Sequence, residues 1–108
     1  MTTEGAEQWT ALLNNVENLR TAFGNATQIE VVAHGQGLSL LVAKDNALAE
    51  RMEKLGASGV VFAACENTMK RKGIGKDQLF AFATTVESGV AEVVRKQEAG
   101  WSYIKSGL

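Results

Sequence analysis

The sequence predicts an α/β domain built around a mostly parallel sheet. Three apolar runs have the length and residue types of buried strands, and they cover residues 28–34, 60–64 and 79–83, the last continuing to residue 86. Segments with apolar residues at every third or fourth position alternate with these runs, which is typical of amphipathic helices. The connections between the runs are too long for hairpins, so we expect parallel strands joined by right-handed crossovers.

Length, charge and composition narrow the class of protein. The 108 residues suit one domain with its own core, and we expect residues 1–108 to form it. A formal net charge of -1 gives no general attraction to nucleic acid or to an anionic membrane, so we expect neither as a partner. No apolar run approaches the roughly 20 residues that span a bilayer, and residues 1–8 lack the features of a signal peptide. A cytoplasmic protein is the expectation.

The first element is expected to be a helix over residues 7–23. Its apolar residues form one stripe, and they are Trp9, Leu12, Leu13, Val16, Leu19 and Phe23. Gly24 and Asn25 supply its C-terminal stop, because glycine and asparagine adopt the left-handed cap conformation at little cost. The first strand follows at residues 28–34.

Between the first two strands, residues 34–37 predict a glycine-containing turn, and residues 38–42 predict a helical turn packed against the sheet. A second amphipathic helix is expected from residue 47 to residue 56, with Asp45 or Asn46 as its cap. Its apolar positions are Leu48, Met52 and Leu55.

The second strand leads directly into Cys65 and a short helix. Lys70, Arg71 and Lys72 form the last turn of this helix and Gly73 caps it, an arrangement that complements the helix dipole. We interpret these cations as a solvated helix end rather than as an anion site.

After the third strand, Ser88 is the expected N-cap of a last helix that Gly100 interrupts. The side chains expected along one side of this helix are Val90, Val93, Val94, Gln97 and Trp101. Trp101 and Tyr103 suit either core packing or an oligomer interface.

The only cysteine and the only histidine each end a predicted strand. Ligands of open parallel sheets bind outside the carboxyl ends of the strands, so we expect His34 and Cys65 on one rim. There His34 is able to activate the Cys65 thiol, and the N–H groups of the following helix favour a thiolate. Glu66, beside the thiol, opposes this effect, which leaves the direction of the thiol pKa open.

The other pocket candidates at this rim are Gly35, Gly37, Glu66, Asn67 and Thr68. Structural roles compete with functional ones, because glycines suit turns, a free cysteine often behaves as a small buried hydrophobe, and a lone histidine is often a hydrogen-bonded structural group.

The chain lacks the third glycine of a dinucleotide fingerprint and the Gly-Lys-Ser/Thr of a P-loop, so we expect no cofactor. One cysteine forms neither an internal disulfide nor a Cys-x-x-Cys metal site, and we expect no metal.

Several segments, in this order, resemble one known family. They are VVAHGQGL (31–38), FAACENTM (62–69), ESGVAE (87–92) and GWSYI (100–104), together with Trp9 and LNNVENL (13–19) in the first helix. Over nearly its whole length, the chain is similar to the small single-domain branch of the DsrE/DsrF-like family.

The resemblance implies a flavodoxin-like or Rossmann-like three-layer α/β sandwich that assembles into trimers or hexamers. In sulfur-relay relatives of the DsrE and TusD type, a cysteine at a strand end accepts sulfane sulfur as a persulfide and passes it on, and Cys65 matches that position. A protein sulfur donor or acceptor is the implied partner. His34 matches no catalytic residue of the family. Relatives usually begin with a strand before the first helix, and the sheet of this chain is expected to lack it.

Three functions stay open at the level of sequence. Cys65 carries persulfide sulfur in a relay, or it is a structural residue of a non-enzymatic oligomeric binding or scaffold module. The third is a thiol redox sensor in which Cys65 joins another subunit by a disulfide, and it ranks below the others because the chain has no resolving cysteine.

Overall fold

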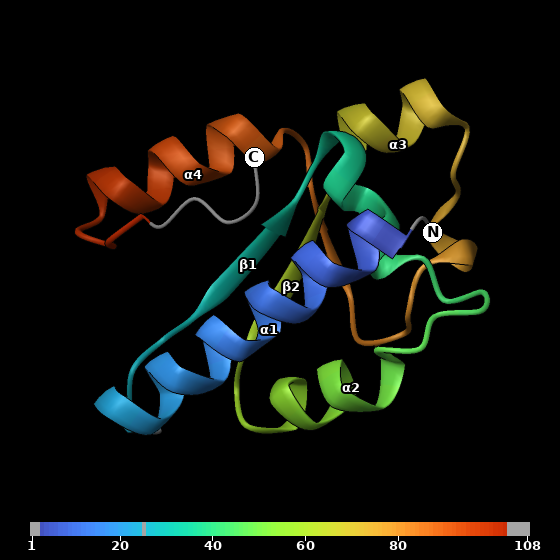
Figure 1. The fold of residues 1–108 in the computed structure, drawn as a ribbon. Coiled ribbons are helices and arrows are strands. Elements are labelled where there is room, and N and C mark those ends of the chain that lie inside the picture. The colour runs from blue at the N-terminus through green and yellow to red at the C-terminus, as the bar shows by residue number, and fades with distance from the viewer. Residues whose placement is uncertain (1–2, 25, 104–108) are drawn as a thin grey trace.

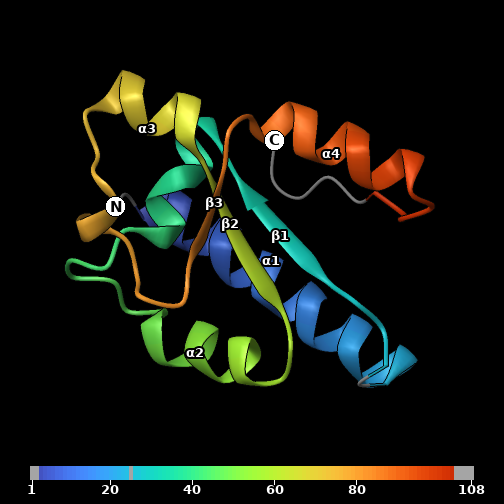
Figure 2. The same cartoon turned by 180° about the vertical axis from the view of Figure 1, so that it is seen from behind.

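Three parallel strands form the sheet of the computed structural model, which describes residues 3–24 and 26–103, with residues 3–6 as backbone only. The strands are β1 (Glu30–Ala33), β2 (Val61–Cys65) and β3 (Thr84–Val86), in the order β1-β2-β3. Figure 2 shows them side by side. The predicted parallel α/β architecture is confirmed.

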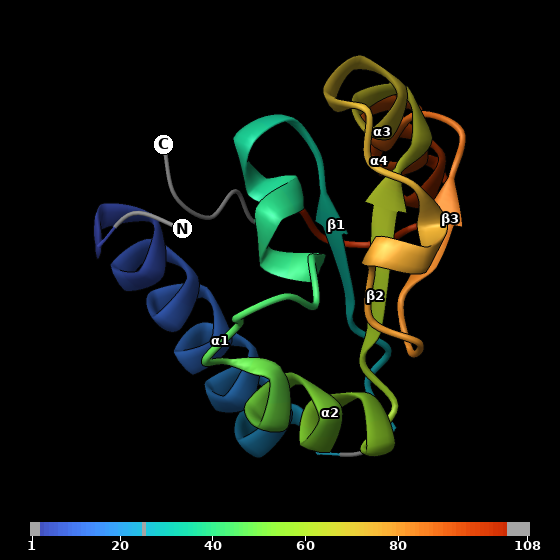
Figure 3. The same cartoon turned by 90° about the vertical axis from the view of Figure 1, so that its right-hand side faces the viewer.

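The helices flank this sheet in two layers. They are α1 (Thr3–Phe23), α2 (Ala49–Ala57), α3 (Glu66–Lys72) and α4 (Gly89–Glu98), with the 3-10 helices η1 (Gly35–Leu41) and η2 (Lys76–Gln78). α1, η1 and α2 lie on one side of the sheet, α4 lies on the other, and α3 continues from the end of β2 (Figures 1 and 3). Within the described residues no strand precedes α1.

The main core lies between the sheet and the layer of α1, η1 and α2. Neighbouring strand residues alternate between the two faces, and the register pairs Val31 with Phe62 and Ala33 with Ala64. These side chains are buried in one cluster with residues of the first layer, including Leu13, Val16, Leu38, Leu41, Met52 and Leu55. The opposite face carries Val32, Ala63 and Cys65, and α4 packs on it.

The prediction of a strand over residues 79–83 is wrong. Only Thr84–Val86 pairs with β2, while Leu79 makes a single antiparallel bridge to Val42. Phe80 and Phe82 instead stack with ring centroids 5.0 Å apart, and Phe82 also meets Phe62 edge to face. The apolar run therefore reflects aromatic packing at the sheet, which needs burial but no strand pairing.

Several apolar positions of the predicted helices face outward. Phe23, expected in the stripe of α1, is 65% exposed, and Val90 and Val94 of α4 are 65% and 47% exposed. α4 also ends at Glu98 rather than continuing to Trp101. Gly100, with a φ of 97°, reverses the chain, and the Trp101 ring lies under Lys96 Nζ at 4.6 Å.

The remaining boundaries differ by a few residues. α1 begins at Thr3, before the expected start, and β1 begins at Glu30. The predicted turn and helical turn at residues 34–42 form one 3-10 helix, η1. The prediction of Asp45 or Asn46 as the cap of α2 is wrong, because the helix begins at Ala49 and Leu48 is its N-cap. Asn46 Oδ1 instead accepts a hydrogen bond from Leu48 N. Among residues 3–24 and 26–103, no helix combines the length and apolar character needed to cross a membrane.

Candidate functional site

Cys65 is the last residue of β2 and the N-cap of α3. Its backbone is extended, with φ -76° and ψ 115°, and Glu66 begins the helix without any intervening loop. α3 ends after seven residues at Gly73, whose φ of 66° is the left-handed conformation expected of a cap. The predicted change from strand to helix at the cysteine is confirmed.

Gly89, the first residue of α4, approaches Cys65 most closely. Its backbone N–H donates a hydrogen bond to Cys65 Sγ over 3.3 Å. A Cβ at position 89 would lie 3.1 Å from His34 Cβ and 3.2 Å from Val32 Cγ1. Glycine is therefore what lets the start of α4 reach the sulfur.

The surroundings of Cys65 favour its ionised form. Burial is the largest single influence and raises the pKa of the thiol, whose residue is only 5% exposed. The Thr68 hydroxyl and the N–H groups of Gly89, Thr68 and Asn67 lower it, in that order of size. Together they outweigh burial, so the pKa of Cys65 lies below its ordinary value, and Glu66 does not reverse this direction.

Thr68 links the segments that follow β1 and β2. Its Oγ1 accepts a hydrogen bond from Gly35 N over 3.0 Å and another from Arg71 Nη2 over 3.3 Å. Asn67 N donates to Glu87 O over 3.3 Å, which attaches the start of α3 to the segment before α4. The segments after β1, β2 and β3 therefore meet around one cysteine.

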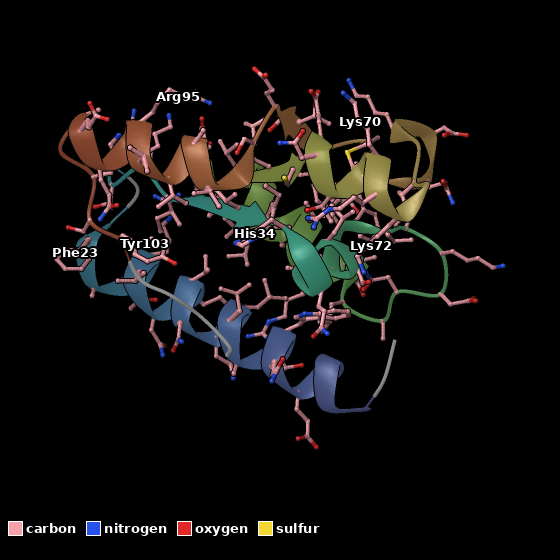
Figure 4. All side chains as sticks on the ribbon, turned by 90° about the horizontal axis from the view of Figure 1, so that it is seen from above. Phe23, His34, Lys70, Lys72, Arg95 and Tyr103 are labelled. Atoms are coloured by element: carbon pink, nitrogen blue, oxygen red, sulfur yellow. The ribbon has the colours of Figure 1, made fainter. Side chains whose placement is uncertain are left out.

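His34 lies at the end of β1, next to the end of β2 (Figure 4). It directly follows Ala33, which pairs with Ala64, so it stands beside Cys65 on the expected rim. Its side chain is exposed, and no hydrogen bond between its ring and Sγ is present among the described contacts. The His34 carbonyl accepts a hydrogen bond from Gly37 N over 3.0 Å, so Gly37 takes part in the turn that follows β1.

The other candidates divide into buried and exposed groups. Thr68 is 1% exposed, Glu66 is half-buried and Asn67 is exposed. Lys70 and Lys72 are exposed and lie on different sides of α3 (Figure 4). Gly89 is not among the site residues predicted from the sequence. A glycine directly after the expected cap Ser88 could have indicated that the start of α4 lies close to another segment.

The prediction of Ser88 as the N-cap of α4 is confirmed, since its Oγ accepts a hydrogen bond from Ala91 N over 3.2 Å.

A second cluster of polar side chains joins β1 to α4. Glu30 faces Glu92, whose side chain is 12% exposed and lies 3.6 Å from Arg95 Nη2 and 3.9 Å from Lys96 Nζ. Burial and then the Glu92 carboxyl raise the pKa of Glu30 to about 7, which Lys96 only partly offsets. A cleft of about 40 Å³ adjoins these groups, lined by Glu30, Val32, Val93, Lys96, Gln97, Trp101, Ser102 and Tyr103.

Metal ligands do not gather at either place. Within the described part of the chain, no group of three or more histidine, cysteine, aspartate or glutamate side chains could hold a metal ion. At the rim, the structure places the Cys65 thiol next to the N–H of Gly89, which donates to its sulfur.

Comparisons with known proteins agree with this architecture. The solved structure of the protein of unknown function MTH1491 from Methanobacterium thermoautotrophicum is 35% identical, with a TM-score of 0.86 over 92% of this chain and 87% of that chain. This likeness confirms the flavodoxin-like α/β sandwich. No protein with a curated description matches the chain. The DsrE/DsrF-like family model matches residues 3–106, and the chain therefore belongs to the DsrE/DsrF-like family.

Proposed function

We propose that the protein is a persulfide carrier in which Cys65 accepts sulfane sulfur and passes it on. The observation that carries the proposal is the position of Cys65 at the junction of β2 and α3, where Gly89 N–H donates to its sulfur over 3.3 Å. The hydrogen-bond donors there lower the pKa of a thiol that burial alone would keep neutral. Membership of a family generally linked to sulfur relay supports the same chemistry. A thiolate is the form of cysteine that attacks sulfur, so hydrogen-bond donors around Sγ serve this reaction directly.

The transfer balances without any external oxidant. The Cys65 thiolate attacks the outer sulfur of a donor persulfide, R–S–SH, so that a new S–S bond forms while the donor S–S bond breaks. The products are Cys65–S–SH and the donor thiolate, R–S⁻. In the second step an acceptor thiolate attacks the outer sulfur of Cys65–S–SH, and Cys65 leaves as a thiolate.

Mass spectrometry of the intact protein tests the proposal. After incubation with a sulfurtransferase and a persulfide-forming sulfur donor, the wild-type chain should gain the mass of one sulfur atom and lose it on reduction. Because Cys65 is the only cysteine, Cys65→Ser is a complete control and should gain nothing. A wild-type chain that remains unmodified, although iodoacetamide alkylates its thiol, would contradict the carrier function.

A second candidate is an oligomeric binding or scaffold module in which Cys65 is structural. The low exposure of Cys65 favours it, since an inert cysteine is usually buried. Titration of the native thiol with a chromogenic disulfide separates the two functions. Reaction of the folded protein supports the carrier, whereas reaction only after denaturation supports the module.

We also infer that the chain acts as a cytoplasmic homo-oligomer, a trimer or hexamer. The exposed Val90 and Val94 lie one turn apart on α4, so they present one apolar strip to solvent. Light scattering after size exclusion should give a trimer or hexamer, and the double variant Val90→Ser, Val94→Ser should give a smaller species. A wild-type monomer at micromolar concentration would refute the assembly.

A further inference from the structure

The hydroxyl group of Thr68 has only one direction left for its proton. A threonine hydroxyl accepts two hydrogen bonds and donates one. Gly35 N and Arg71 Nη2 occupy both acceptor positions of Thr68 Oγ1, at 3.0 Å and 3.3 Å. The side chain is 1% exposed, so its donor proton must find a protein partner rather than bulk water.

The sulfur of Cys65 is the partner within reach. Thr68 follows Cys65 by three residues at the start of α3, which places the two side chains on one face of the first turn. A threonine inside a helix often donates to the carbonyl three or four residues earlier, which here belongs to Cys65 or to Ala64 in β2. The Thr68 hydroxyl is, however, the donor that lowers the pKa of the Cys65 thiol most. This favours the sulfur over these carbonyls as its acceptor.

Arg71 strengthens this donor. Its guanidinium carries a full positive charge and donates a hydrogen bond to Thr68 Oγ1. The proton on this same oxygen is the one that points towards the sulfur. Hydrogen bonds in a chain polarise one another, so a cation on Oγ1 makes the hydroxyl a better donor. The guanidinium is exposed, whereas the hydroxyl that it contacts is buried. Thr68 thus connects a surface cation to a buried sulfur.

We propose that Thr68 is a positioning residue that donates a hydrogen bond to the Cys65 thiolate, and that Arg71 acts on the sulfur through it. This inference rests on the proposed function, because it assigns the groups that keep Cys65 ready to accept sulfur and to leave as a thiolate. It also gives Gly35, the first residue of η1, a role, since the N–H of this residue holds the Thr68 hydroxyl in place. The groups that act on the sulfur thereby come from the segments after both β1 and β2.

The rate of alkylation by iodoacetamide across pH measures the thiol pKa directly. Thr68→Val keeps the shape but removes the hydroxyl, and it should raise the thiol pKa by about one unit, which lowers the rate near neutral pH by about tenfold. Thr68→Ser restores a hydroxyl and should return the pKa to that of the wild type. Because Arg71 lies at the surface, Arg71→Ala should leave the fold intact and raise the thiol pKa by a smaller amount.

Lys70→Ala is the matched control for charge. Lys70 is an exposed cation of the same helix, and the described hydrogen bonds to Thr68 Oγ1 come from Gly35 and Arg71 instead. A folded Thr68→Val protein with an unchanged thiol pKa would overturn the role of Thr68. Equal effects of Arg71→Ala and Lys70→Ala would overturn the role of Arg71, because they would reduce it to general charge.

The outcome is distinguishable from failure of the carrier function. If wild-type protein gains sulfur in the mass spectrometer while Thr68→Val leaves the thiol pKa unchanged, the role of Thr68 is refuted and the carrier stands. If Thr68→Val raises the pKa but wild-type protein takes no sulfur, the hydrogen bond is supported and the carrier function is refuted.

Discussion

The chemistry of Cys65 depends on a residue 24 positions away in the chain. Gly89 N–H donates to Sγ over 3.3 Å, and this contact exists only because no side chain stands between α4 and the ends of β1 and β2. Backbone N–H groups make durable donors, because their position is fixed by the fold rather than by side-chain rotamers. At the scale of single residues, the hydrogen bond to the thiol therefore depends on the absence of a Cβ at Gly89.

Gly89→Ala tests this close approach. The added Cβ would lie 3.1 Å from His34 Cβ and 3.4 Å from Cys65 Cβ, so these neighbours or the start of α4 must shift by a few tenths of an ångström. An outward shift of α4 would lengthen the hydrogen bond to sulfur. We expect a loss of about 1–3 kcal/mol in the free energy of unfolding, measured in urea. A rise in the thiol pKa, measured by alkylation, should accompany it.

Gly56→Ala serves as the control for this substitution. A Cβ at Gly56 has nothing within 4 Å, and the residue lies inside α2. Its stability should stay the same or rise by up to about 1 kcal/mol, because alanine is the better helix former. If Gly89→Ala behaved like Gly56→Ala in both the free energy of unfolding and the thiol pKa, the close approach of Gly89 would affect neither, and this prediction would be wrong.

The sequence predicts the thiol but not its whole environment. Cys65 and Thr68 are adjacent to a visible change from strand to helix, so local pattern is sufficient to place them together. The contact with Gly89 depends on how α4 returns across the sheet, and this tertiary geometry leaves no periodic signal. His34 reaches the predicted rim by strand register, yet its side chain turns to solvent, an orientation that the sequence does not determine.

At the scale of elements, β1 and α4 meet through a pair of carboxyl groups. Glu30 retains its proton up to a pH of about 7 because it is partly buried against Glu92. α4 also carries Gly89 at its first turn, so the position of this helix affects both the carboxyl pair and the sulfur. A glutamate inside the apolar run of residues 28–34 could have indicated this contact, but its partner on α4 could not be predicted from it.

Glu30→Gln should remove a pH dependence of stability. The folded protein holds the Glu30 proton to about pH 7, whereas the unfolded chain releases it near 4.5. Between these values the folded state binds more protons, so the wild-type free energy of unfolding falls as pH rises. Glutamine carries no charge, so the variant should exceed wild type by about 1 kcal/mol near pH 8 and by little near pH 4, after allowing for solvent screening.

Urea unfolding of both proteins at several pH values measures this difference. Glu53→Gln removes an exposed carboxylate from α2 and should follow the wild-type profile. An advantage of Glu30→Gln that is equal at both ends of the pH range would refute the buried carboxyl pair.

Element prediction succeeded where periodicity and pairing agree. α1, α2, β1 and β2 each bury one side or both, and their patterns record it. The strand prediction for residues 79–83 is wrong because Phe80 and Phe82 are partly buried by stacking on each other, which produces an apolar run without ladder hydrogen bonds. Val90 and Val94 belong to the expected apolar side of α4, yet both are exposed. An apolar side chain on a helix need not face the sheet of its own chain.

For the whole molecule, the parallel sheet brings three chain segments to one place. The segments that follow β1, β2 and β3 contribute Gly35, Thr68 and Gly89, and all three act at or near the sulfur. Parallel strands make this convergence possible because their carboxyl ends share an edge of the sheet. The sequence predicts the α/β architecture, and the parallel strands of this architecture bring the three segments to one edge of the sheet.

The central claim is that folding makes the Cys65 thiol more acidic in spite of its burial. The most direct measurement is the pH dependence of iodoacetamide alkylation, compared between the native protein and the same protein unfolded in urea. We predict that the midpoint of the native profile lies below that of the unfolded chain, because the hydrogen-bond donors around Sγ outweigh burial. A native midpoint equal to or above the unfolded one would contradict the account, because burial would then outweigh the hydrogen-bond donors.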